Sequence, residues 1–549
     1  MSLPRVDRRT LLLAAGGAAG LAGQGGAWRW IEQPDPQIYR PGMADGHWLR
    51  EQGAALTQQL PDETLDTGVA ILGSGVAGLS CAWQLARAGF RDVVLVQGPE
   101  RDGNCAAGQF GALAYPRGAH YLPLPSMESR HVRDMLHDTG VLEGDPYADA
   151  PVFDEMALVH APEERLLKDG RWHDELLPMQ GIDPALAAEH QRFHLVIHDL
   201  SQAVGRDGKK AFAIPRLLSS SDPAFVALDA LTMRDWLVQN RFESPWLRWY
   251  CDYACRDDYG IGSDQASAWA GLHYFASRGG RAANADPGAV LTWPNGLGAL
   301  SQKLRDRIKQ HLTPLPLREL SGMAIHVQEN EFGTESLIVD RASGRVVRLR
   351  ARQVVLAMPL MVAARILAGA QSEFGLSAPA LPTYAPWLVG NVLLEGFPRE
   401  REGSPLAWDN VIYGSPALGY VVSTHQQWGL ANPRQTVFTT YRSLHDMSSA
   451  EARRWLLEAS PDALWQSASE DLRVAYPRGL WRHVCKVEIT VRGHAMSSPR
   501  PGLLMDRTLQ QARQGGRRVH FAHADLSGLS VFEEASYWGC EVAKRLLGC

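Results

Sequence analysis

The chain alternates short, wholly apolar runs with longer amphipathic stretches, and the clearest such pair begins at residue 69. Residues 69–72 are all apolar, as expected of a strand that is buried on both faces of a parallel sheet. Residues 79–88 then follow a helical period and end at Gly89, and residues 93–96 form a second apolar run. The order strand, helix, strand over about thirty residues predicts a βαβ unit.

Later parts of the chain repeat these patterns without repeating the sequence. Residues 127–278 are helical in character and rich in Trp and Tyr, and residues 532–547 predict a final helix. Further strand-like segments are 325–327, 336–339, 346–349, 354–356 and 519–522. The predicted boundaries are 66–126, 285–373 and 501–549 for a discontinuous dinucleotide-binding domain, and 127–284 and 374–500 for an inserted substrate domain.

The N-terminus has the pattern of a targeting signal rather than of a folded segment. Arg8 and Arg9 precede a mildly hydrophobic run rich in Ala and Gly, and residues 1–30 resemble a twin-arginine export signal. This predicts recognition by the twin-arginine machinery and a periplasmic location, and leaves cleavage of the signal open. A slightly apolar N-terminal tail is the alternative interpretation. Residues 33–66 are polar and contain Pro, and we interpret them as an N-terminal extension of the mature chain.

Composition narrows the class of protein. A chain of 549 residues exceeds one ordinary core, so two domains are expected. The 60 acidic and 55 basic residues form no long run of one sign, which gives no support to a nucleic-acid partner. After the first thirty residues no apolar stretch is long enough to cross a membrane. The seven cysteines include no CxxC pair, and no His lies at ligand spacing, so no metal site is expected.

The turn after the first apolar run carries the pattern Gly73-Ser74-Gly75-Val76-Ala77-Gly78. Gly73 allows the tight turn, Gly75 lets a pyrophosphate approach the backbone, and Gly78 lets the helix pack close to the sheet. The amides of Val76 and Ala77 open the helix and are available to an anion. Because the motif follows a strand and opens a helix, it predicts a dinucleotide site.

One position departs from the usual dinucleotide fingerprint. About twenty residues after the glycine turn, an Asp or Glu normally binds the ribose hydroxyls. This chain has Gln97 at the end of the second apolar run. An amide can still form a hydrogen bond there, but the contribution of the charge is lost.

Separated stretches of the chain resemble the flavin-containing amine oxidase superfamily. One is the βαβ unit with the following residues 99–104, where the family has an acidic-basic run ending in paired glycines and this chain has Asp102 in place of the first. A second is 116–121, similar to the glycine-rich turn beside the flavin ring. A third is 354–360, which resembles a family strand ending in an apolar-Pro-apolar corner. The last comprises 521–525 and 532–535, similar to the C-terminal FAD segment.

The resemblance implies a fold and a cofactor. It implies an α/β protein with a discontinuous Rossmann-type FAD-binding domain and a mixed-sheet α+β substrate domain with helical insertions. It also implies that Asp525 contacts the ribityl–phosphate part of FAD and that the final helix faces the flavin pyrimidine ring, where its amides stabilise negative charge. The remaining contacts that it implies are Gly103, Asn104, Gly118, Ala119, His120, Val327, Met358, Pro359, Phe532, Glu533 and Glu534.

Candidates for catalysis come from the inserted region. Many family members carry a lysine that holds a water near flavin N5, and the best local match places Asn391 at that position. Trp387 and Tyr441 are candidates for an aromatic cage around an amine. His494 is a candidate for a side chain that points toward the cleft, with a purely structural histidine as the alternative. His523, which stands in place of a family glycine, is either a proton carrier near the flavin or a histidine bonded to backbone. The stretch Cys251-Asp252, with Arg256-Asp257-Asp258-Tyr259, predicts either an acidic mouth for a cationic substrate or a solvated helix face.

The leading hypothesis is therefore an FAD-dependent oxidoreductase that oxidises an amine, of polyamine type on the resemblance, by hydride transfer to flavin N5. A desaturase or isomerase that acts on an apolar polyene is a second hypothesis. A third is an exported flavin-binding accessory protein without turnover of its own. The first predicts a small-molecule amine as the partner, with aromatic and acidic groups around it.

Overall fold

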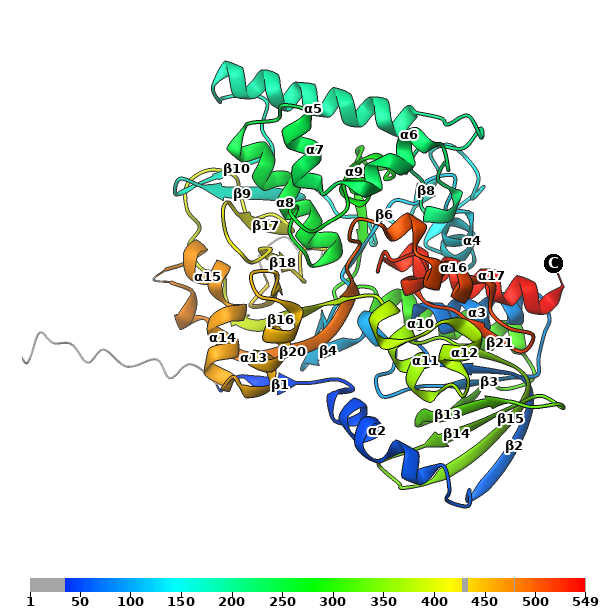
Figure 1. Cartoon of the computed structure of the whole chain (residues 1–549). Helices are drawn as coiled ribbons and strands as arrows, with labels where there is room; N and C mark the ends of the chain where they lie inside the picture. The colour runs from blue at the N-terminus through cyan, green and yellow to red at the C-terminus, as the bar shows by residue number, and fades with distance from the viewer. Residues whose placement is uncertain (1–34, 427–432, 478, 549) are drawn as a thin grey trace, which may run out of the picture.

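The computed structural model describes residues 35–426, 433–477 and 479–548, and the proposed signal at 1–30 lies outside these ranges. Two large sheets dominate the described chain, one of seven strands and one of eight. Helices surround both sheets, and the two lie side by side in the molecule (Figure 1).

The seven-stranded sheet is a Rossmann-type sheet with an antiparallel extension. Its order is β12-β3-β2-β15-β14-β13, and β21 pairs with β15. Neighbours in the series β12, β3, β2, β15 and β21 are parallel, which is a doubly wound order, while β13, β14 and β15 are antiparallel. The strands are β2 (Glu63–Leu72), β3 (Val93–Val96), β12 (Arg318–Leu320), β13 (Met323–Glu329), β14 (Thr334–Val339), β15 (Val346–Leu356) and β21 (Val519–Phe521).

The central strand β2 is longer than its apolar run. Residues 63–66 alternate between exposed and partly buried positions, while residues 67–72 are buried throughout. The apolar run at 69–72 therefore predicted only the apolar part of the buried half of this strand. Helix α3 (Val76–Arg87) starts three residues earlier than its apolar period, because the glycine turn itself supplies the first helical turn. The final helix α17 (Phe532–Leu547) matches the prediction.

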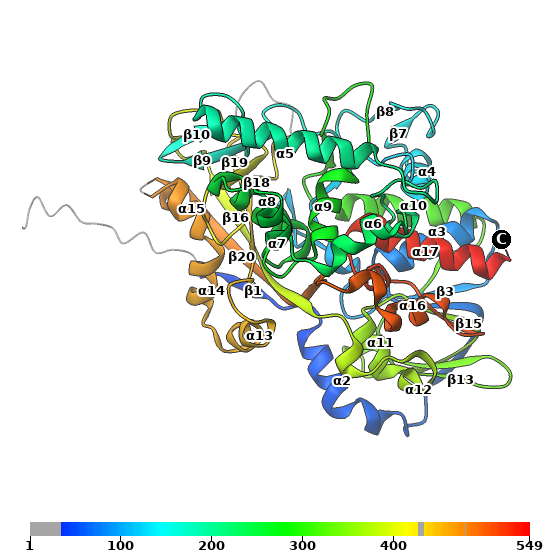
Figure 2. The same ribbon diagram turned by 45° about the horizontal axis from the view of Figure 1, so that its top comes forward.

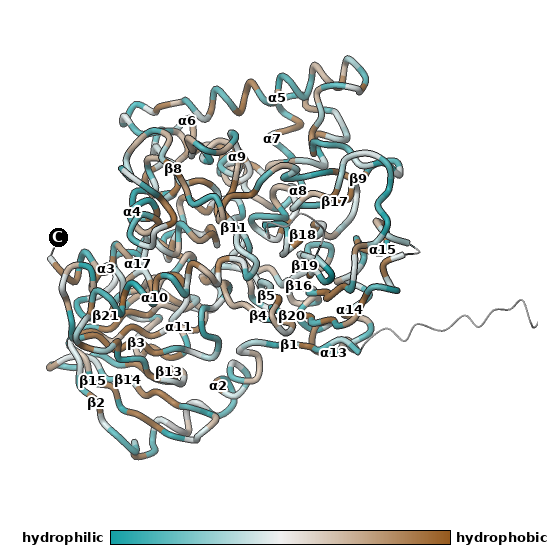
Figure 3. The backbone as a smooth tube through the Cα atoms, turned by 180° about the vertical axis from the view of Figure 1, so that it is seen from behind, coloured by the Kyte–Doolittle hydropathy of each residue, from teal (hydrophilic) through white to brown (hydrophobic). Residues whose placement is uncertain are grey.

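Helices α3, α10 (Gly298–Leu312) and α17 pack together on this domain, and α17 contacts α3 along most of its length. Their apolar faces share one core with strands β2 and β3. Hydrophobic stretches, drawn in brown, run along the strands of this sheet (Figure 3). Further helices on this side are α4 (Arg130–Asp138), α11 (Leu360–Ile366), α12 (Ala370–Phe374) and α16 (Arg507–Gln514).

The eight-stranded sheet is mixed, in the order β1-β20-β16-β19-β18-β17-β9-β10. It gathers strands from three distant parts of the chain. They are β1 (Gln37–Tyr39), β9 (Glu164–Lys168), β10 (Arg171–His173), β16 (Tyr384–Glu395), β17 (Asp409–Ile412), β18 (Tyr420–Val422), β19 (Gln435–Ser443) and β20 (Val484–Ser497). Helices α13 (Ser449–Glu458), α14 (Pro461–Ala468) and α15 (Glu470–Ala475) pack beside it. Three two-stranded ribbons complete the strands: β4 (Ala107–Phe110) with β5 (Leu113–Pro116), β6 (Tyr121–Pro123) with β11 (Val290–Thr292), and β7 (Leu142–Glu143) with β8 (Val152–Phe153).

A helical layer covers the far side of the substrate region, with α5 (Pro184–Gln202) along its outer edge (Figure 2). The other helices of this layer are α6 (Pro223–Val226), α7 (Met233–Gln239), α8 (Pro245–Tyr259) and α9 (Ala268–Ala276). Helix α8 begins at the N-cap Ser244, whose hydroxyl accepts the Leu247 amide, and ends at Gly260 in the left-handed region. The last turn of α8 lies in the interior, where Arg256, Asp258 and Tyr259 are buried.

The N-terminal extension is folded. Strand β1 and helix α2 (Met43–Leu56) occupy the stretch that the sequence indicated only as polar and Pro-containing. Within the described ranges, none of the helices has both the length and the hydrophobicity to cross a membrane. The same residues hold no cluster of three or more metal-ligating side chains.

Candidate active site

A cavity of about 670 Å³ lies at the carboxyl ends of the parallel strands, where doubly wound sheets bind their ligands. Twelve of the predicted cofactor contacts line it. They are Gly73, Gly75, Val76, Ala77, Gln97, Gly103, Asn104, Ala119, Met358, Pro359, Asp525 and Phe532. We call this space the cofactor cavity.

The glycine turn forms the floor of the cofactor cavity. Gly73 has φ +118°, and a Cβ at this residue would overlap the carbonyl oxygen of Ala357. Gly78 does not line the cavity, because it packs against the backbone of Gly73. Gly75 is the N-cap of α3 and forms no side-chain cap with the described residues. The first amides of α3 are therefore open to an anion in the cavity.

The acid near the ribose position, Glu100, is already paired with an arginine. Gln97 lines the cavity, as does Glu100 three residues later. Arg492 donates to both oxygens of Glu100, at 2.8 and 3.0 Å, and is itself buried. Glu100 therefore balances Arg492 and does not replace the missing acid at position 97.

Asp525 lies fully buried at the edge of the cofactor cavity. Its Oδ2 accepts the Leu360 amide at 2.9 Å and the Tyr384 hydroxyl at 2.5 Å. Its Oδ1 has no hydrogen-bond partner among the described residues, since His523 Nδ1, 3.3 Å away, accepts the Asp525 amide instead. Burial raises the pKa of Asp525, but His523, Tyr384 and the Leu360 amide outweigh it, so that the net shift is downward. An ionised carboxylate with one free acceptor thus faces the cavity.

The structure places two further predicted cofactor contacts, Val327 and Glu534, away from both cavities. Val327 is buried in β13 and lines neither cavity of the site, whereas Met323 and Ala324 of the same strand line the cofactor cavity. Glu534 turns away from both cavities, because its carboxylate accepts the Arg216 amide and the Ser527 hydroxyl, each at 2.5 Å. Glu534 thus holds the start of α17 in place.

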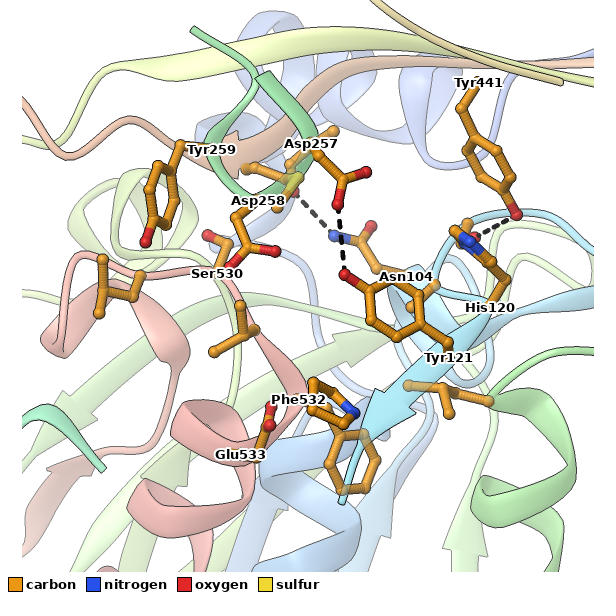
Figure 4. Close-up of a pocket in the computed structure, with 18 of the residues that line it drawn as sticks. Asn104, His120, Tyr121, Asp257, Asp258, Tyr259, Tyr441, Ser530, Phe532 and Glu533 are labelled. Atoms are coloured by element: carbon orange, nitrogen blue, oxygen red, sulfur yellow. Dashed lines mark hydrogen bonds between the residues drawn. The ribbon is translucent and has the colours of Figure 1, made fainter. Parts of the chain in front are cut away.

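A second cavity, of about 150 Å³, adjoins the first, and we call it the substrate cavity (Figure 4). Gly118, His120 and Glu533, predicted as cofactor contacts, line this cavity and not the first. The two cavities meet at the residues that line both. These are Asn104, Ala119, Arg492, Ala495, Ser530, Val531 and Phe532.

Asn104 holds this junction together. Its Nδ2 donates to the Ala495 carbonyl at 2.8 Å, and its Oδ1 accepts from Arg492 at 3.2 Å. The Asn104 carbonyl accepts the Ala119 amide at 2.8 Å. The segment after β3, strand β20 and the segment before β6 are therefore tied to one another where the cavities meet.

Buried carboxyls from α8 reach the substrate cavity from one side. Arg278 donates to both oxygens of Asp258, at 2.6 and 2.7 Å, which forms a closed ion pair. Asp257 accepts only the Tyr121 hydroxyl, at 3.2 Å, as Figure 4 shows. Burial, with the neighbouring Asp258 second, raises the pKa of Asp257. The solvated helix face that the sequence left open is excluded, since this end of α8 is buried.

Glu533 adds another carboxyl from the start of α17. It is 4% exposed, and burial raises its pKa to about 7. Arg278 acts against this shift but is already paired with Asp258. The substrate cavity therefore contains Asp257 and Glu533 without a basic partner of their own among the described residues.

Aromatic side chains form the wall opposite the acids. Tyr441 stacks on His120 with ring centroids 4.3 Å apart, and its hydroxyl donates to the Gly118 carbonyl at 3.1 Å. Burial lowers the pKa of His120 to about 3, so this ring is neutral. Trp387 also lines the cavity, and its buried Nε1 has no partner among the described residues.

The other two catalytic candidates lie elsewhere. Asn391 is fully buried and lines neither cavity. Its Nδ2 donates to the Pro116 carbonyl at 3.0 Å, and its Oδ1 accepts the Thr439 hydroxyl at 2.8 Å. Its contacts are those of a structural residue that holds β5 against the eight-stranded sheet. His494 lines the cofactor cavity rather than the substrate cavity, and burial lowers its pKa to about 4.

Several cavity residues escaped the sequence analysis. Tyr384, Arg453 and the segment around α2 line the cofactor cavity without any motif that marks them. Arg278, which pairs with Asp258, also had no signal, because only packing brings it to α8.

Comparison with known proteins supports the fold. Residues 71–139 match the family described as NAD(P)-binding Rossmann-like domain. No curated protein sequence matches the chain. Among solved structures, putrescine oxidase bound to putrescine superposes with a TM-score of 0.61 at 15% identity, over 88% of this chain and 100% of that one.

Two other structures show the breadth of this fold. Cyclohexylamine oxidase from Brevibacterium oxydans has a TM-score of 0.58 at 16% identity, over 88% of this chain and 99% of the other. A fatty acid isomerase from P. acnes has a TM-score of 0.57 at 15% identity, over 87% and 98%. The predicted fold class is thus confirmed: the chain has an amine oxidase-like fold, with an α/β Rossmann-like FAD-binding domain joined to a mixed sheet.

Proposed function

We propose that the protein binds FAD in the cofactor cavity and oxidises a cationic amine in the substrate cavity. The observation that carries this proposal is the junction of the two cavities at Asn104, Ala119 and Phe532. A flavin ring at this junction would touch a space in which the partly buried carboxyl of Asp257 and the buried carboxyl of Glu533 have no cation of their own among the described residues. The fold is shared with enzymes of other reactions, so the choice of an amine depends on these carboxyls.

The described residues fit FAD. The open amides at the start of α3 suit its pyrophosphate, and the free acceptor of Asp525 suits a ribityl hydroxyl. Helix α17 also begins without a side-chain cap among the described residues, and its first residue, Phe532, lines both cavities. Its amides would stabilise negative charge on a reduced flavin. Bound FAD supplies the acceptor for a hydride that leaves the carbon next to the amine nitrogen.

The chain itself binds and orients the substrate. Asp257 pairs with an ammonium group, which compensates for its burial. His120, Tyr441 and Trp387 present ring faces to the alkyl part of the amine. An ammonium must lose one N–H proton before hydride leaves, and Glu533, with its raised pKa and its place next to Phe532, accepts it.

Export remains part of the proposal. A twin-arginine route would deliver the protein to the periplasm with its cofactor already bound, and it depends on residues 1–30 alone. The physiological electron acceptor is a separate matter. Asn391 lines neither cavity, so its place at the family lysine position carries no argument about the rate of reaction with oxygen.

The test is anaerobic mixing of the yellow holoprotein with a panel of mono- and diamines, followed by flavin absorbance. We expect bleaching of the flavin by amines and none by unsaturated fatty acids or other polyenes. Bleaching by polyenes alone would replace the amine with the desaturase or isomerase hypothesis. Silence with both panels would favour the accessory protein without turnover, and a folded protein that takes up no FAD would end the proposal.

A further inference from the structure

The N-terminal extension crosses from one sheet to the other. Strand β1 pairs in parallel with β20 at the edge of the eight-stranded sheet, with Gln37 opposite Glu488. Helix α2 begins four residues after the end of β1, and it packs against β13 of the seven-stranded sheet. Gly42, with φ +64°, forms the turn between them. Figure 1 shows β1 and α2 in sequence along the lower side of the two domains.

This bridge forms a wall of the cofactor cavity. The residues that line it are Pro41, Gly42, Met43, Asp45, Gly46, His47, Leu49 and Arg50. A Cβ at Gly42 would lie 3.6 Å from the Cβ of Pro99, two residues beyond Gln97. Leu49 is buried in the same core as Met323 and Ala324. The wall therefore stands at the ribose end of the cavity, where the fingerprint acid is missing.

Side chains hold the bridge at both ends. Tyr39 lies under the Arg117 guanidinium, 4.1 Å from the ring centroid. At the other end, Arg341 in the turn between β14 and β15 donates to Asp45 at 2.6 Å. The same guanidinium lies 5.3 Å from the ring centroid of Trp48. One arginine thus makes two contacts with α2.

We infer that residues 41–50 form a cover that retains FAD by closing the ribose end of its cavity. The inference depends on the proposed function, because it takes FAD as the occupant. The covered end can open only when α2 lifts from β13, so local opening of α2 controls release of the cofactor. The cover offsets the acid that Gln97 lacks by slowing dissociation instead of adding a contact.

The test weakens the outer contacts of α2 and leaves the cavity lining unchanged. Arg341→Ala removes the pair with Asp45 and the contact with Trp48. The matched control is Arg345→Ala, in the same turn, which removes an ion pair to Glu63 of β2 instead. Release of FAD is followed by flavin fluorescence after dilution of each holoprotein. We expect release about five- to tenfold faster in Arg341→Ala and unchanged in Arg345→Ala.

Hydrogen exchange of the unaltered protein gives a second measurement that needs no variant. FAD should slow exchange of the α2 amides, and it should leave the outer helix α5 unchanged. Equal release from both variants with unprotected α2 amides, in a protein that does hold FAD, would overturn the cover and leave the proposed function standing. A chain that takes up no FAD would overturn both.

Discussion

The two adjoining cavities are built from different parts of the chain. The cofactor cavity is shaped by backbone: the glycine turn, two helix starts without side-chain caps among the described residues, and the end of β15. The substrate cavity is shaped by side chains that come from α8, β16, β19 and α17. The cofactor cavity is therefore preorganised by the backbone fold. The substrate cavity is determined by the side chains that tertiary packing brings together.

The carboxyls of the two cavities also differ, in their partners and in the direction of their pKa shifts. At the cofactor cavity, partners lower the pKa of Asp525 and Arg492 pairs with Glu100. At the substrate cavity, burial raises the pKa values of Asp257 and Glu533. A raised carboxyl pKa marks a buried acid that lacks compensation. The carboxyls of the first cavity are thus paired with groups of the protein, and on the proposed function a cationic substrate would pair with those of the second.

The largest effect is expected at the glycine turn, where the backbone conformation alone determines the shape of the cavity. Gly73→Ala places a Cβ against the Ala357 carbonyl at φ +118° and should destabilise the protein by about 3 kcal/mol, with loss of flavin. Gly75→Ala is the matched control for folding, since a Cβ there meets no described atom within 4 Å. It should melt like the parent apoprotein yet bind FAD more weakly. Thermal unfolding and flavin content measure both, and equal stability of the two variants would contradict this account.

Asp257→Asn tests the side-chain cavity. Removing the charge should lower kcat/KM for amines about 100-fold, because a buried ammonium loses its partner, and should leave FAD content unchanged. Asp264→Asn is the control, as this aspartate pairs with Arg234 at the surface. A variant that lost flavin instead of amine turnover would show that the two cavities are not separable.

The raised pKa values predict a dependence on pH. Glu533 binds more protons in the folded than in the unfolded chain between its ordinary pKa, 4.5, and its raised value of about 7. Its own contribution to the free energy of unfolding of the ligand-free protein therefore falls as pH rises through this interval, while buried histidines with lowered pKa values, such as His120 and His131, contribute with the opposite sign.

A bound cation opposes this loss. The increase in melting temperature caused by an amine ligand should therefore grow between pH 5 and 8, and Glu533→Gln should reduce this growth. The measurement is thermal unfolding with and without the amine. A ligand effect independent of pH would contradict the assignment of these acids to substrate binding.

The backbone-built features were the ones that sequence could predict. The spacing of Gly73, Gly75 and Gly78 determines a local conformation, and the apolar runs around it determine a parallel sheet. Val327 lies away from the cavity because its strand begins at Met323, and the start of that strand, not its middle, reaches the cavity. Helix α2 was missed because its polar and apolar residues give little helical periodicity.

The side-chain features depended on tertiary packing. Asn391 shares the face of β16 that carries Trp387, but β5 covers it, and no local pattern shows where a hairpin will lie. The pair Asp257 and Asp258 fitted a solvated helix face equally well until the end of α8 was found buried. Glu534 follows Glu533 in the sequence, yet on a helix the two point in different directions.

Tyr441→Phe is expected to have the smallest effect of these substitutions. It tests whether the substrate cavity depends on a hydrogen bond to the backbone or on an aromatic ring. It removes the hydrogen bond to the Gly118 carbonyl and keeps the ring on His120. Loss of one such bond corresponds to about 1 kcal/mol, or about a fivefold lower kcat/KM. Tyr441→Leu, which also removes the ring, should lower it further, since the aromatic face contacts the amine. Equal losses in both variants would mean that Tyr441 acts only through its hydrogen bond to the Gly118 turn. Its ring would then have no contact with the substrate.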